Sequence, residues 1–526
     1  MFKRFISVLL LVLMTVSFVT GCSMASEASL VPKVVEAAEG QSVVAHTAKK
    51  TPKYIFMFIG DGMAAVQVNS AQIYGGNNQH NNMKLDVLNF QNFEAVGYQT
   101  THDATSFAPD SASTATALSS GFKTWSGTIG LKPVGNISGN KVENADANAV
   151  PKTIAERLKI EKGMKIGIAS TVTLNHATPA AYYAHTASRN DYYDIASQMA
   201  DSGFDYFAGG TLSQRFGKNN DQKDAYEVLR DKGYTVVDTK EEILALNNVS
   251  GKTYAVSPVI QDGGAMPYAV DNKEGDLTLA NFVEKGIDVL DNDKGFFMMV
   301  ESGKIDWAGH ANDAKANIGD VLAFEDSIQV AIDFAKKNPE ETLIVVTGDH
   351  ETGGMTIGQA TTNYDTALEI LKNQKMTYVA FDELFNEMIE ENPELTYEEV
   401  TPVIRENFGL KNEYNDSDQG AKDSYMALEL SDKEVNRLKV AFAETISDER
   451  IEEDAEEFFK LYGGYNPLSV TLTHILNNKA GMGWTSYAHT GVPVPVYATG
   501  AQAELFNGAY DNTEVYHKLV EAAGLK

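Results

Sequence analysis

The sequence contains very little cysteine. A single residue, Cys22, occurs in 526, which excludes a scaffold held together by disulfide bonds. Hydrophobic residues make up 43% of the chain, enough to bury a core, so global disorder is also excluded. The length exceeds that of a typical single domain. We therefore expect either a large α/β domain with an insertion or two to three domains.

Positive charge is scarce as well. The chain has 43 Lys and Arg against 72 Asp and Glu, a formal charge of −29. A surface with this charge repels a phosphate backbone, so we predict no nucleic-acid binding by charge. An anionic substrate would need local cations to overcome the same field, and bound metal ions are the obvious source.

Long hydrophobic runs are nearly absent. The longest, Phe5–Val19, covers about fifteen residues, fewer than the roughly 20 of a membrane-spanning helix. It follows Lys3 and Arg4 and precedes small residues, which is the layout of a secretory signal. We predict a signal peptide over residues 1–21.

The end of this signal predicts a lipid anchor. Its last residues, Val-Thr-Gly-Cys, resemble a lipobox, in which the chain is cut before the cysteine and the thiol is diacylated. An ordinary signal peptide with an incidental cysteine is the alternative. We expect a lipoprotein attached to the cell membrane through Cys22, with residues 22–52 as a tether and an extracytoplasmic domain over residues 53–526.

Short unbroken apolar runs predict a parallel sheet. Such runs suit strands buried on both faces, and helical stretches, for example 150–158 and 317–336, fall between them. The predicted strands cover 54–59, 165–169, 295–300 and 342–347. The alternation predicts an α/β fold, a doubly wound, mostly parallel sheet with helices on both faces.

One segment interrupts this alternation. Residues 381–460 hold 24 Asp and Glu against 8 Lys and Arg. Capping boxes at Thr396 and Ser431, each with a glutamate three residues later, predict two helix starts. We interpret residues 376–465 as an acidic helical insertion, and residues 415–420 as a solvated acidic turn, since their oxygen ligands fall at the wrong positions for a calcium loop.

Acids and histidines follow three of the predicted strands. Asp61 follows the first run, Glu301 and Asp306 follow the third, and Asp349 and His350 follow the fourth. Open α/β sheets bind their ligands at the carboxyl ends of strands. One acid there is commonly a cap or turn residue, but three such sites, each beside glycine and two with histidine nearby, favour a metal centre.

A loop ending in Pro-Asp-Ser leads into a helix of small residues at Ser111. The helix N-terminus there offers free N–H groups and a positive dipole end. A serine hydroxyl is a poor nucleophile unless something deprotonates it. By itself, the segment is better explained by Asp110 or Ser111 as a helix cap and by a helix of small residues for close packing.

Six segments in order resemble the alkaline phosphatase family. The resemblance spans roughly residues 53 to 526 without the acidic insertion. The segments are Ile59–Met63, Asp110–Leu118, His176–Pro179 with Arg189 beyond it, Glu301–His310, Thr347–Gly354 and Ala488–Gly491.

The resemblance implies an enzyme that hydrolyses phosphate monoesters and releases inorganic phosphate. Ser111 would be the nucleophile that becomes a phosphoserine, and Arg189 would hold two phosphate oxygens. Two zinc ions and one magnesium ion would assist. The first zinc would bind Asp306, His310 and His489; the second Asp61, Asp349 and His350, with Ser111 as a further ligand; the magnesium Asp61, Thr178 and Glu301. Family members are often dimers, so a homodimer is an expectation.

Two positions depart from one branch of the family. His176 stands where some members have Asp, and Trp307 where some have Lys and others His. Our hypothesis is that the missing cation at Trp307 weakens binding of the product phosphate. His176 puts the metal preference of the third site in question. Between two of the proposed ligands, Lys304 is expected to orient the backbone.

Two other functions are weighed against this one. A diesterase or another relative in the same superfamily would share the metal-binding acids and histidines. A non-catalytic lipoprotein could have kept the fold to bind metal or phosphate. The match at Arg189 and the third-metal set favour the monoesterase, and the complete set of nucleophile, arginine and ligands argues against a non-catalytic protein.

Overall fold

The computed structural model describes residues 50–77, 82–133, 150–411, 428–447 and 455–526. The predicted signal peptide, Cys22, nearly all of the tether and the acidic turn at 415–420 lie outside these residues. Among the residues described, no helix is both long and apolar enough to cross a membrane.

The described residues form a ten-stranded sheet in which β13 alone runs against its neighbours. Every other strand pair in this sheet is parallel, which confirms the predicted mostly parallel sheet. In spatial order the strands are β14 (Gly508–Asp511), β2 (Ala95–Thr100), β13 (Val494–Gly500), β8 (Thr342–Gly348), β1 (Tyr54–Gly60), β7 (Phe296–Ser302), β3 (Lys165–Ser170), β4 (Tyr206–Gly209), β6 (Thr253–Val256) and β5 (Thr235–Val237).

The central strand β1 contributes to two cores. Tyr54, Phe56 and Phe58 belong to one hydrophobic cluster. Ile55, Met57 and Ile59 belong to the other. Successive side chains of a strand point to opposite faces, so this sequence is continuously apolar because both faces of the sheet are covered.

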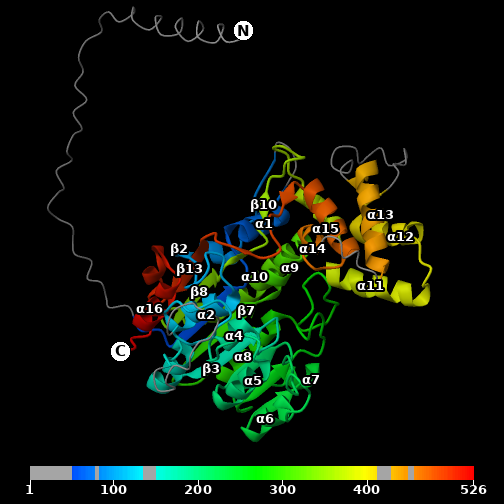
Figure 1. Ribbon diagram of the computed structural model, residues 1–526. Helices are drawn as coiled ribbons and strands as arrows, with labels where there is room; N and C mark the ends of the chain where they lie inside the picture. Colours follow the sequence, from blue (N-terminus) through cyan, green and yellow to red (C-terminus); the bar gives the residue numbers. More distant parts are fainter. Residues whose placement is uncertain (1–49, 78–81, 134–149, 412–427, 448–454) are drawn as a thin grey trace, which may run out of the picture. The chain divides into compact units, whose positions relative to one another are not determined.

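Helices cover both faces, as predicted for a doubly wound fold (Figure 1). The core that contains Phe56 includes residues of α1 (Ala65–Gly75), α8 (Leu279–Leu290) and α10 (Ala314–Lys337). The opposite core includes residues of α2 (Ser111–Ser120), α5 (Tyr192–Asp201) and α16 (Thr513–Ala522).

Short elements complete the fold. Two of them, β12 (His489–Thr490) and β9 (Glu351–Thr352), pair so that His489 lies opposite Thr352. The others are α4 (Ala177–Ala180), α6 (Ala225–Asp231), α7 (Lys240–Leu244), α9 (Lys304–His310), β10 (Thr356–Ile357) and β11 (Met482–Gly483).

Local capping explains where two helices depart from the sequence prediction. The helix expected from residue 150 begins later, as α3 (Ile154–Arg157), and continues as a π-helix over Leu158–Lys162. Thr153 caps α3 and forms a capping box with Glu156, which fixes the start. Helix α10 begins three residues before the predicted start because Asp313 caps it by accepting from Ala316 N.

The acidic segment is helical in its described part, and the capping boxes at Thr396 and Ser431 are confirmed. Its helices lie together (Figure 1, yellow to orange), and α11 and α13 contact α15 (Pro467–Lys479). They are α11 (Tyr378–Glu391), α12 (Tyr397–Phe408), α13 (Asp432–Ile446) and α14 (Ala455–Tyr462). Apolar residues of α11, α12 and α13 join the core that contains Phe56, and most of the acidic side chains on these three helices are exposed. The boundaries of the insertion stay a prediction.

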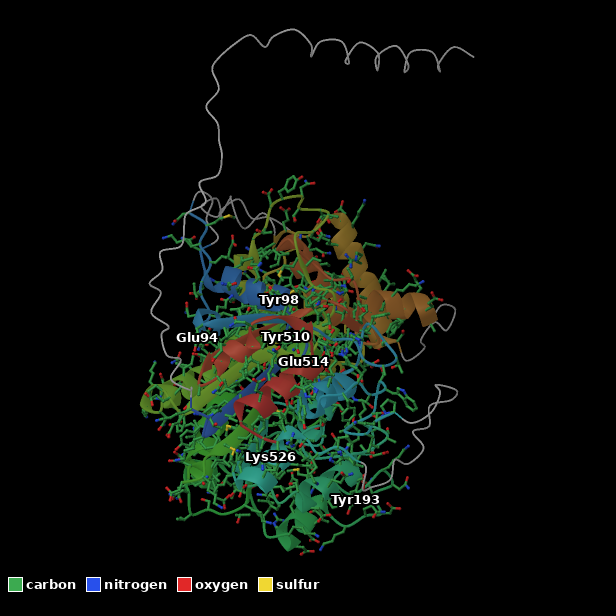
Figure 2. All side chains as sticks on the ribbon, turned by 90° about the vertical axis from the view of Figure 1, so that its left-hand side faces the viewer. Glu94, Tyr98, Tyr193, Tyr510, Glu514 and Lys526 are labelled. Atoms are coloured by element: carbon green, nitrogen blue, oxygen red, sulfur yellow. The ribbon has the colours of Figure 1, made fainter. Side chains whose placement is uncertain are left out.

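One edge of the sheet is formed late in the sequence. Figure 2 faces this edge, where Tyr98 of β2 and Tyr510 of β14 are labelled. Gly97 must be a glycine here, because a Cβ at that position would lie 2.3 Å from the Phe506 carbonyl oxygen. The edge therefore depends on close approach of two backbones.

Candidate active site

The site lies at the carboxyl ends of β8, β1 and β7, which are neighbours in the sheet. In register, Gly60 is opposite both Ser302 and Gly348. Parallel strands in this register bring the residues that follow them to one edge. Asp61, Glu301 and Asp349 are consequently close together and fully buried, and the sequence prediction of a shared site at the strand ends agrees with this geometry.

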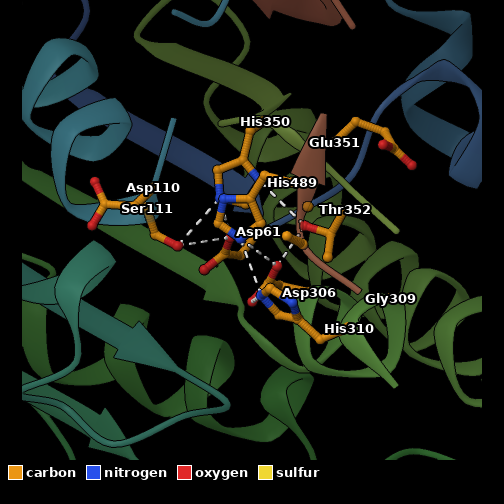
Figure 3. A network of polar contacts seen from close by, with 12 residues as sticks. Asp61, Asp110, Ser111, Asp306, Gly309, His310, His350, Glu351, Thr352 and His489 are labelled. Atoms are coloured by element: carbon orange, nitrogen blue, oxygen red, sulfur yellow. Dashed lines mark hydrogen bonds and ion pairs between the residues drawn. The ribbon is translucent and has the colours of Figure 1, made fainter. Parts of the chain in front are cut away.

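The first group of donors surrounds His350. Its Nε2 atom lies 3.2 Å from Asp61 Oδ1 and 3.4 Å from Asp349 Oδ2. The Ser111 hydroxyl oxygen lies 3.2 Å from the same nitrogen and 3.5 Å from Asp61 Oδ1. Figure 3 shows the Ser111 side chain pointing at this group. The nucleophile candidate and one metal-ligand set are therefore in contact.

A threonine sets the orientation of the His350 ring. Thr352 donates its hydroxyl hydrogen to Asp306 at 2.5 Å and lies 3.2 Å from His350 Nδ1. Because that hydroxyl hydrogen is already committed, the Nδ1–H of His350 donates to Thr352. The Nε2 lone pair then faces Asp61, Asp349 and Ser111, as a metal ligand requires.

The second group comprises Asp306, His310 and His489. His310 Nε2 lies 3.3 Å from Asp306 Oδ2 and 3.1 Å from His489 Nε2, which is itself 3.4 Å from Asp306 Oδ1. Each imidazole donates its Nδ1–H to a backbone carbonyl, His310 to Tyr487 at 2.6 Å and His489 to Pro109 at 2.5 Å. With both rings neutral, the two Nε2 lone pairs face each other beside a carboxylate, and a cation shared by them would replace the proton that Asp306 favours on His310, whose pKa is raised to about 9 although burial opposes the charge.

The third group lies around Asp61 and Glu301. Thr178 donates its hydroxyl hydrogen to Asp61 Oδ2 at 3.3 Å, and Ser170 donates to Glu301 Oε2. The other oxygen of Glu301 is buried and has no hydrogen-bond partner among the described residues. Nδ1 of His176 is buried without a described partner too, and His176 has a ligand atom within reach of Asp61 and Glu301.

Burial and crowding raise the pKa of three carboxyls of the site, whereas His310 and His489 hold that of Asp306 below its ordinary value despite its burial. Burial first, and then repulsion by Asp349 and Asp306, raises the pKa of Asp61 well above its ordinary value. Burial likewise raises the pKa of Glu301 to about 8 and that of Asp349 to about 6. Positive charge placed among these groups would reverse the shifts.

The donor chemistry fits divalent cations. Carboxylate oxygens combined with imidazole nitrogens suit zinc, and the set of carboxylates with a threonine hydroxyl suits magnesium. The unpartnered oxygen of Glu301 and the facing nitrogens of His310 and His489 are the observations that need a ligand.

Arg189 faces the same space as Ser111. Its Nη1 donates to Asp110 Oδ2 at 3.0 Å and its Nη2 donates to His176 Nε2 at 3.3 Å. Arg189 and Ser111 line one cavity of about 470 Å³. The other residues that line it are His176, Asp262, Asp306, Trp307, His310, Tyr378, Tyr465 and His489.

Every residue proposed from the sequence for a catalytic or metal-binding role belongs to these groups or lines this cavity. Sequence reasoning missed Asp262, Tyr378 and Tyr465, which lie outside the recognised segments and carry no local signal. It also assigned Asp110 only a capping role and overlooked Thr352 inside a recognised segment. The ammonium group of Lys304 is buried, pairs with Asp262 at 3.2 Å and does not line the cavity, and its expected effect on the backbone stays a prediction.

Comparison with known proteins decides the family. The sequence profile of the family described as alkaline phosphatase matches residues 52–215 and 203–525. The chain belongs to the alkaline phosphatase family. It is therefore a hydrolase of phosphate monoesters, and the observed fold is the alkaline phosphatase fold.

Individual relatives agree along most of the chain. Alkaline phosphatase 3 of Bacillus subtilis is 32% identical over 484 residues, which are 89% of this chain and 88% of the relative. The crystal structure of Thermus thermophilus alkaline phosphatase has a TM-score of 0.70 and 25% identity, over 91% of this chain and 93% of that one. A TAB5 alkaline phosphatase variant with histidine changed to glutamate and "Mg bound in the M3 site" has a TM-score of 0.58 and 25% identity, over 91% of this chain and 99% of that one.

Proposed function

We propose that this alkaline phosphatase transfers the phosphoryl group of a monoester to Ser111 and then hydrolyses the phosphoserine. The observation that carries the proposal is the position of the Ser111 hydroxyl, within 3.5 Å of both Asp61 and His350 and in one cavity with Arg189. An arginine that can hold phosphate in the cavity of a serine nucleophile favours a monoesterase over a diesterase or a purely metal-binding protein.

Each residue has a defined task in this mechanism. The Arg189 guanidinium can hold two phosphate oxygens with two parallel N–H donors, which positions the phosphorus for attack by Ser111. Asp110 accepts from Arg189 and fixes the guanidinium in place. Because Ser111 is the first residue of α2, the positive end of the helix faces the phosphoryl oxygens and favours their negative charge.

We propose that two zinc ions and one magnesium ion are the cofactors. Asp306, His310 and His489 would hold one zinc, and Asp61, Asp349 and His350 the other, beside Ser111. Asp61, Thr178 and Glu301 would hold the magnesium. When bound, these cations supply the positive charge that lowers the pKa of a hydroxyl group and offsets charge that develops during phosphoryl transfer.

His176 bears on the metal preference of the third site. Its ring reaches the group of Asp61 and Glu301 and has an unpartnered buried nitrogen. The related TAB5 variant in which a histidine is changed to glutamate holds magnesium in its M3 site. By analogy we propose that an acid in place of His176 strengthens magnesium binding here, since magnesium prefers oxygen donors.

We further propose that the protein is a lipoprotein outside the cytoplasm. The support is in the sequence, namely the basic start, the apolar run and the lipobox-like end of residues 1–21 before Cys22. The phosphoserine at Ser111 would be a transient modification. We propose a homodimer because members of the family are often dimers. Analytical ultracentrifugation of the purified protein tests this oligomeric state.

A comparison of substrates and variants tests the proposed reaction. We expect hydrolysis of a phosphate monoester to exceed that of a diester at saturating zinc and magnesium, and a chelator to abolish it. Faster diester hydrolysis would assign a diesterase, and metal binding without hydrolysis of either ester would assign a non-catalytic protein.

The Ser111→Ala variant tests the intermediate. Wild-type protein incubated with radiolabelled phosphate and quenched in acid should retain label on serine, and Ser111→Ala should not. The variant should also lose nearly all turnover. Ser197→Ala on α5, whose hydroxyl only bonds the Tyr193 carbonyl, is the control that should keep both. Near-normal turnover in Ser111→Ala would refute the mechanism.

A further inference from the structure

The cavity that holds Ser111 and Arg189 is lined in part by aromatic side chains. Trp307 comes from α9, Tyr378 from the first residue of α11, and Tyr465 from the turn after α14. All three side chains line the cavity. The two tyrosines are 87 positions apart in the sequence, at the two ends of the predicted acidic insertion, yet both reach the site.

These rings are held in defined orientations. Tyr378 and Tyr465 meet edge to face, with ring centroids 5.5 Å apart and planes at 89°. The Tyr378 hydroxyl bonds the Tyr268 hydroxyl at 2.9 Å, which fixes its ring. Trp307 meets the His176 ring at 5.9 Å. Trp307 and Tyr465 remain half-buried, so parts of both rings face the cavity.

A carboxylate lines the same cavity. Asp262 lines the cavity with its side chain 30% exposed. Lys304 and Tyr268 both bond its Oδ2 atom, at 3.2 and 3.4 Å. Its backbone has a φ of +52°, a left-handed conformation that few residues other than Gly, Asn and Asp adopt readily. The carboxylate is therefore presented to the cavity by a constrained turn.

The two ends of the cavity differ in charge. One end carries the Arg189 guanidinium beside Ser111. At the other end Asp262 pairs with Lys304, and burial lowers the pKa of Lys304 although Asp262, Asp320 and Asp271 favour its charged form. Lys304 is buried and lies 4.6 Å from the Trp307 ring centroid, so it does not enter the cavity. A ligand that fits both ends would be anionic at one end and cationic at the other.

We propose that Trp307, Tyr378, Tyr465 and Asp262 form a subsite for an ammonium-bearing leaving group, so that phosphate monoesters of amino alcohols are the preferred substrates. Aromatic faces attract an ammonium group through their quadrupoles, most strongly where water is displaced. Asp262 adds a formal opposite charge, which a neutral aromatic leaving group would not use. This inference rests on the proposed function, because it assumes that the phosphate lies between Ser111 and Arg189.

Two substrates that differ only in charge test the subsite. Phosphocholine and 3,3-dimethylbutyl phosphate have nearly the same shape, but a nitrogen cation in the first replaces a carbon in the second. We expect kcat/KM for phosphocholine to be about tenfold higher, the size of one well-desolvated cation–π contact. Asp262→Asn keeps a residue that tolerates positive φ, and Tyr465→Leu removes one ring. Each variant should bring the ratio of kcat/KM for phosphocholine to kcat/KM for 3,3-dimethylbutyl phosphate severalfold closer to one.

Conservative and distant variants serve as controls. Tyr465→Phe keeps the aromatic face and should keep the ratio. Tyr193→Leu on α5 and Asp288→Asn on α8 repeat the same chemical changes outside the cavity and should also leave the ratio as in wild type.

Direct binding separates failure of the subsite from failure of the proposed function. Calorimetry with Ser111→Ala protein, loaded with zinc and magnesium, measures both esters without turnover. Tighter binding of phosphocholine, lost in Asp262→Asn, would support the subsite even if the phosphoserine mechanism failed. A ratio near one in wild type, by turnover and by binding, would overturn it. A preference for phenyl phosphate over both esters that disappears in Tyr465→Leu would overturn it in favour of aromatic leaving groups.

Discussion

Asp110 binds Arg189 and caps the helix that begins at Ser111. Its Oδ2 accepts from Arg189 Nη1 at 3.0 Å, and its Oδ1 accepts from Ser113 N at 3.1 Å. Burial alone would raise the pKa of Asp110, but Arg189 and these hydrogen bonds hold it below its ordinary value. One carboxylate thus fixes the guanidinium relative to the nucleophile.

Arg189→Lys should damage phosphate binding more than folding. Lysine keeps the charge but cannot make two parallel hydrogen bonds, so we expect kcat/KM for a monoester to fall at least about tenfold. The inhibition constant of inorganic phosphate should rise with it. Steady-state kinetics and thermal melting check this, with Arg157→Lys in α3 as the control. Unchanged phosphate inhibition would contradict the assigned role.

Removal of metal should destabilise the protein as well as inactivate it. Without cations, Asp61, Glu301 and Asp349 are buried together, and burial with mutual repulsion disfavours their charged forms. We expect a chelator to lower the melting temperature by several degrees or more, and zinc with magnesium to restore it. A metal-free protein with the same melting temperature would show that metal bound by these residues does not stabilise the fold.

Asp382 on α11 should make stability depend on pH. Burial raises its pKa to about 7, and one of its oxygens has no described partner. Since the unfolded value is about 3.9, the folded state holds a proton between the two values and the unfolded state does not. The contribution of the protonated Asp382 carboxyl to the free energy of unfolding is therefore fully present below pH 4 and is lost as the pH rises through about 7.

Asp382→Asn removes this titration. The variant should be more stable than wild type at pH 8.5, by about 1–2 kcal/mol after allowance for partial exposure, and should gain little at pH 5. Urea unfolding at both pH values measures the difference. Glu387→Gln, on the exposed side of the same helix, is the control. An equal effect at both pH values would mean that Asp382 does not titrate in this range.

Trp307→Lys should strengthen product inhibition. Trp307 lines the cavity with Arg189, and an indole donates at most one hydrogen bond and no charge. A lysine there would add a cation near the phosphate, so we expect the inhibition constant of inorganic phosphate to fall severalfold. An unchanged constant would mean that a side chain at this position does not reach the product.

Cys22→Ala should release the protein from the membrane. Without the thiol there is no acyl attachment. The sequence has one long apolar run, which lies within residues 1–21. Fractionation of cells that express each form should find wild type in the membrane pellet and the variant in the soluble extracytoplasmic fraction, with equal specific activity. Wild type in the soluble fraction would exclude the anchor.

The sequence predicts the centre of the fold well and its periphery less well. The strands β1, β3, β7 and β8 are visible because burial on both faces leaves unbroken apolar runs. The antiparallel direction of β13 leaves no such mark, since strand direction depends on the connection and the partner. The start of α3 also depends on a cap, Thr153, which the apolar pattern does not reveal.

The same contrast holds for the site. Asp61 and Asp349 can be predicted because they directly follow strands, and Glu301 because it is the last residue but one of a strand; strand order then brings the three together. Tyr378 and Tyr465 reach the cavity only through the packing of α11 and the turn after α14. Asp262 reaches it through a turn with positive φ. No local pattern encodes either of these placements.

The position of β1 has a consequence for how the chain is made. This strand is the first to leave the ribosome and lies at the centre of the sheet, yet its partners β7 and β8 follow much later. The 235 residues between Gly60 and Phe296 must be synthesised first, which takes on the order of 10 to 50 s. During that time Tyr54–Gly60, which is apolar along its length, has no strand to pair with. We expect this segment to stay exposed until β7 and β8 are available, and the centre of the sheet to assemble only after β8 is complete.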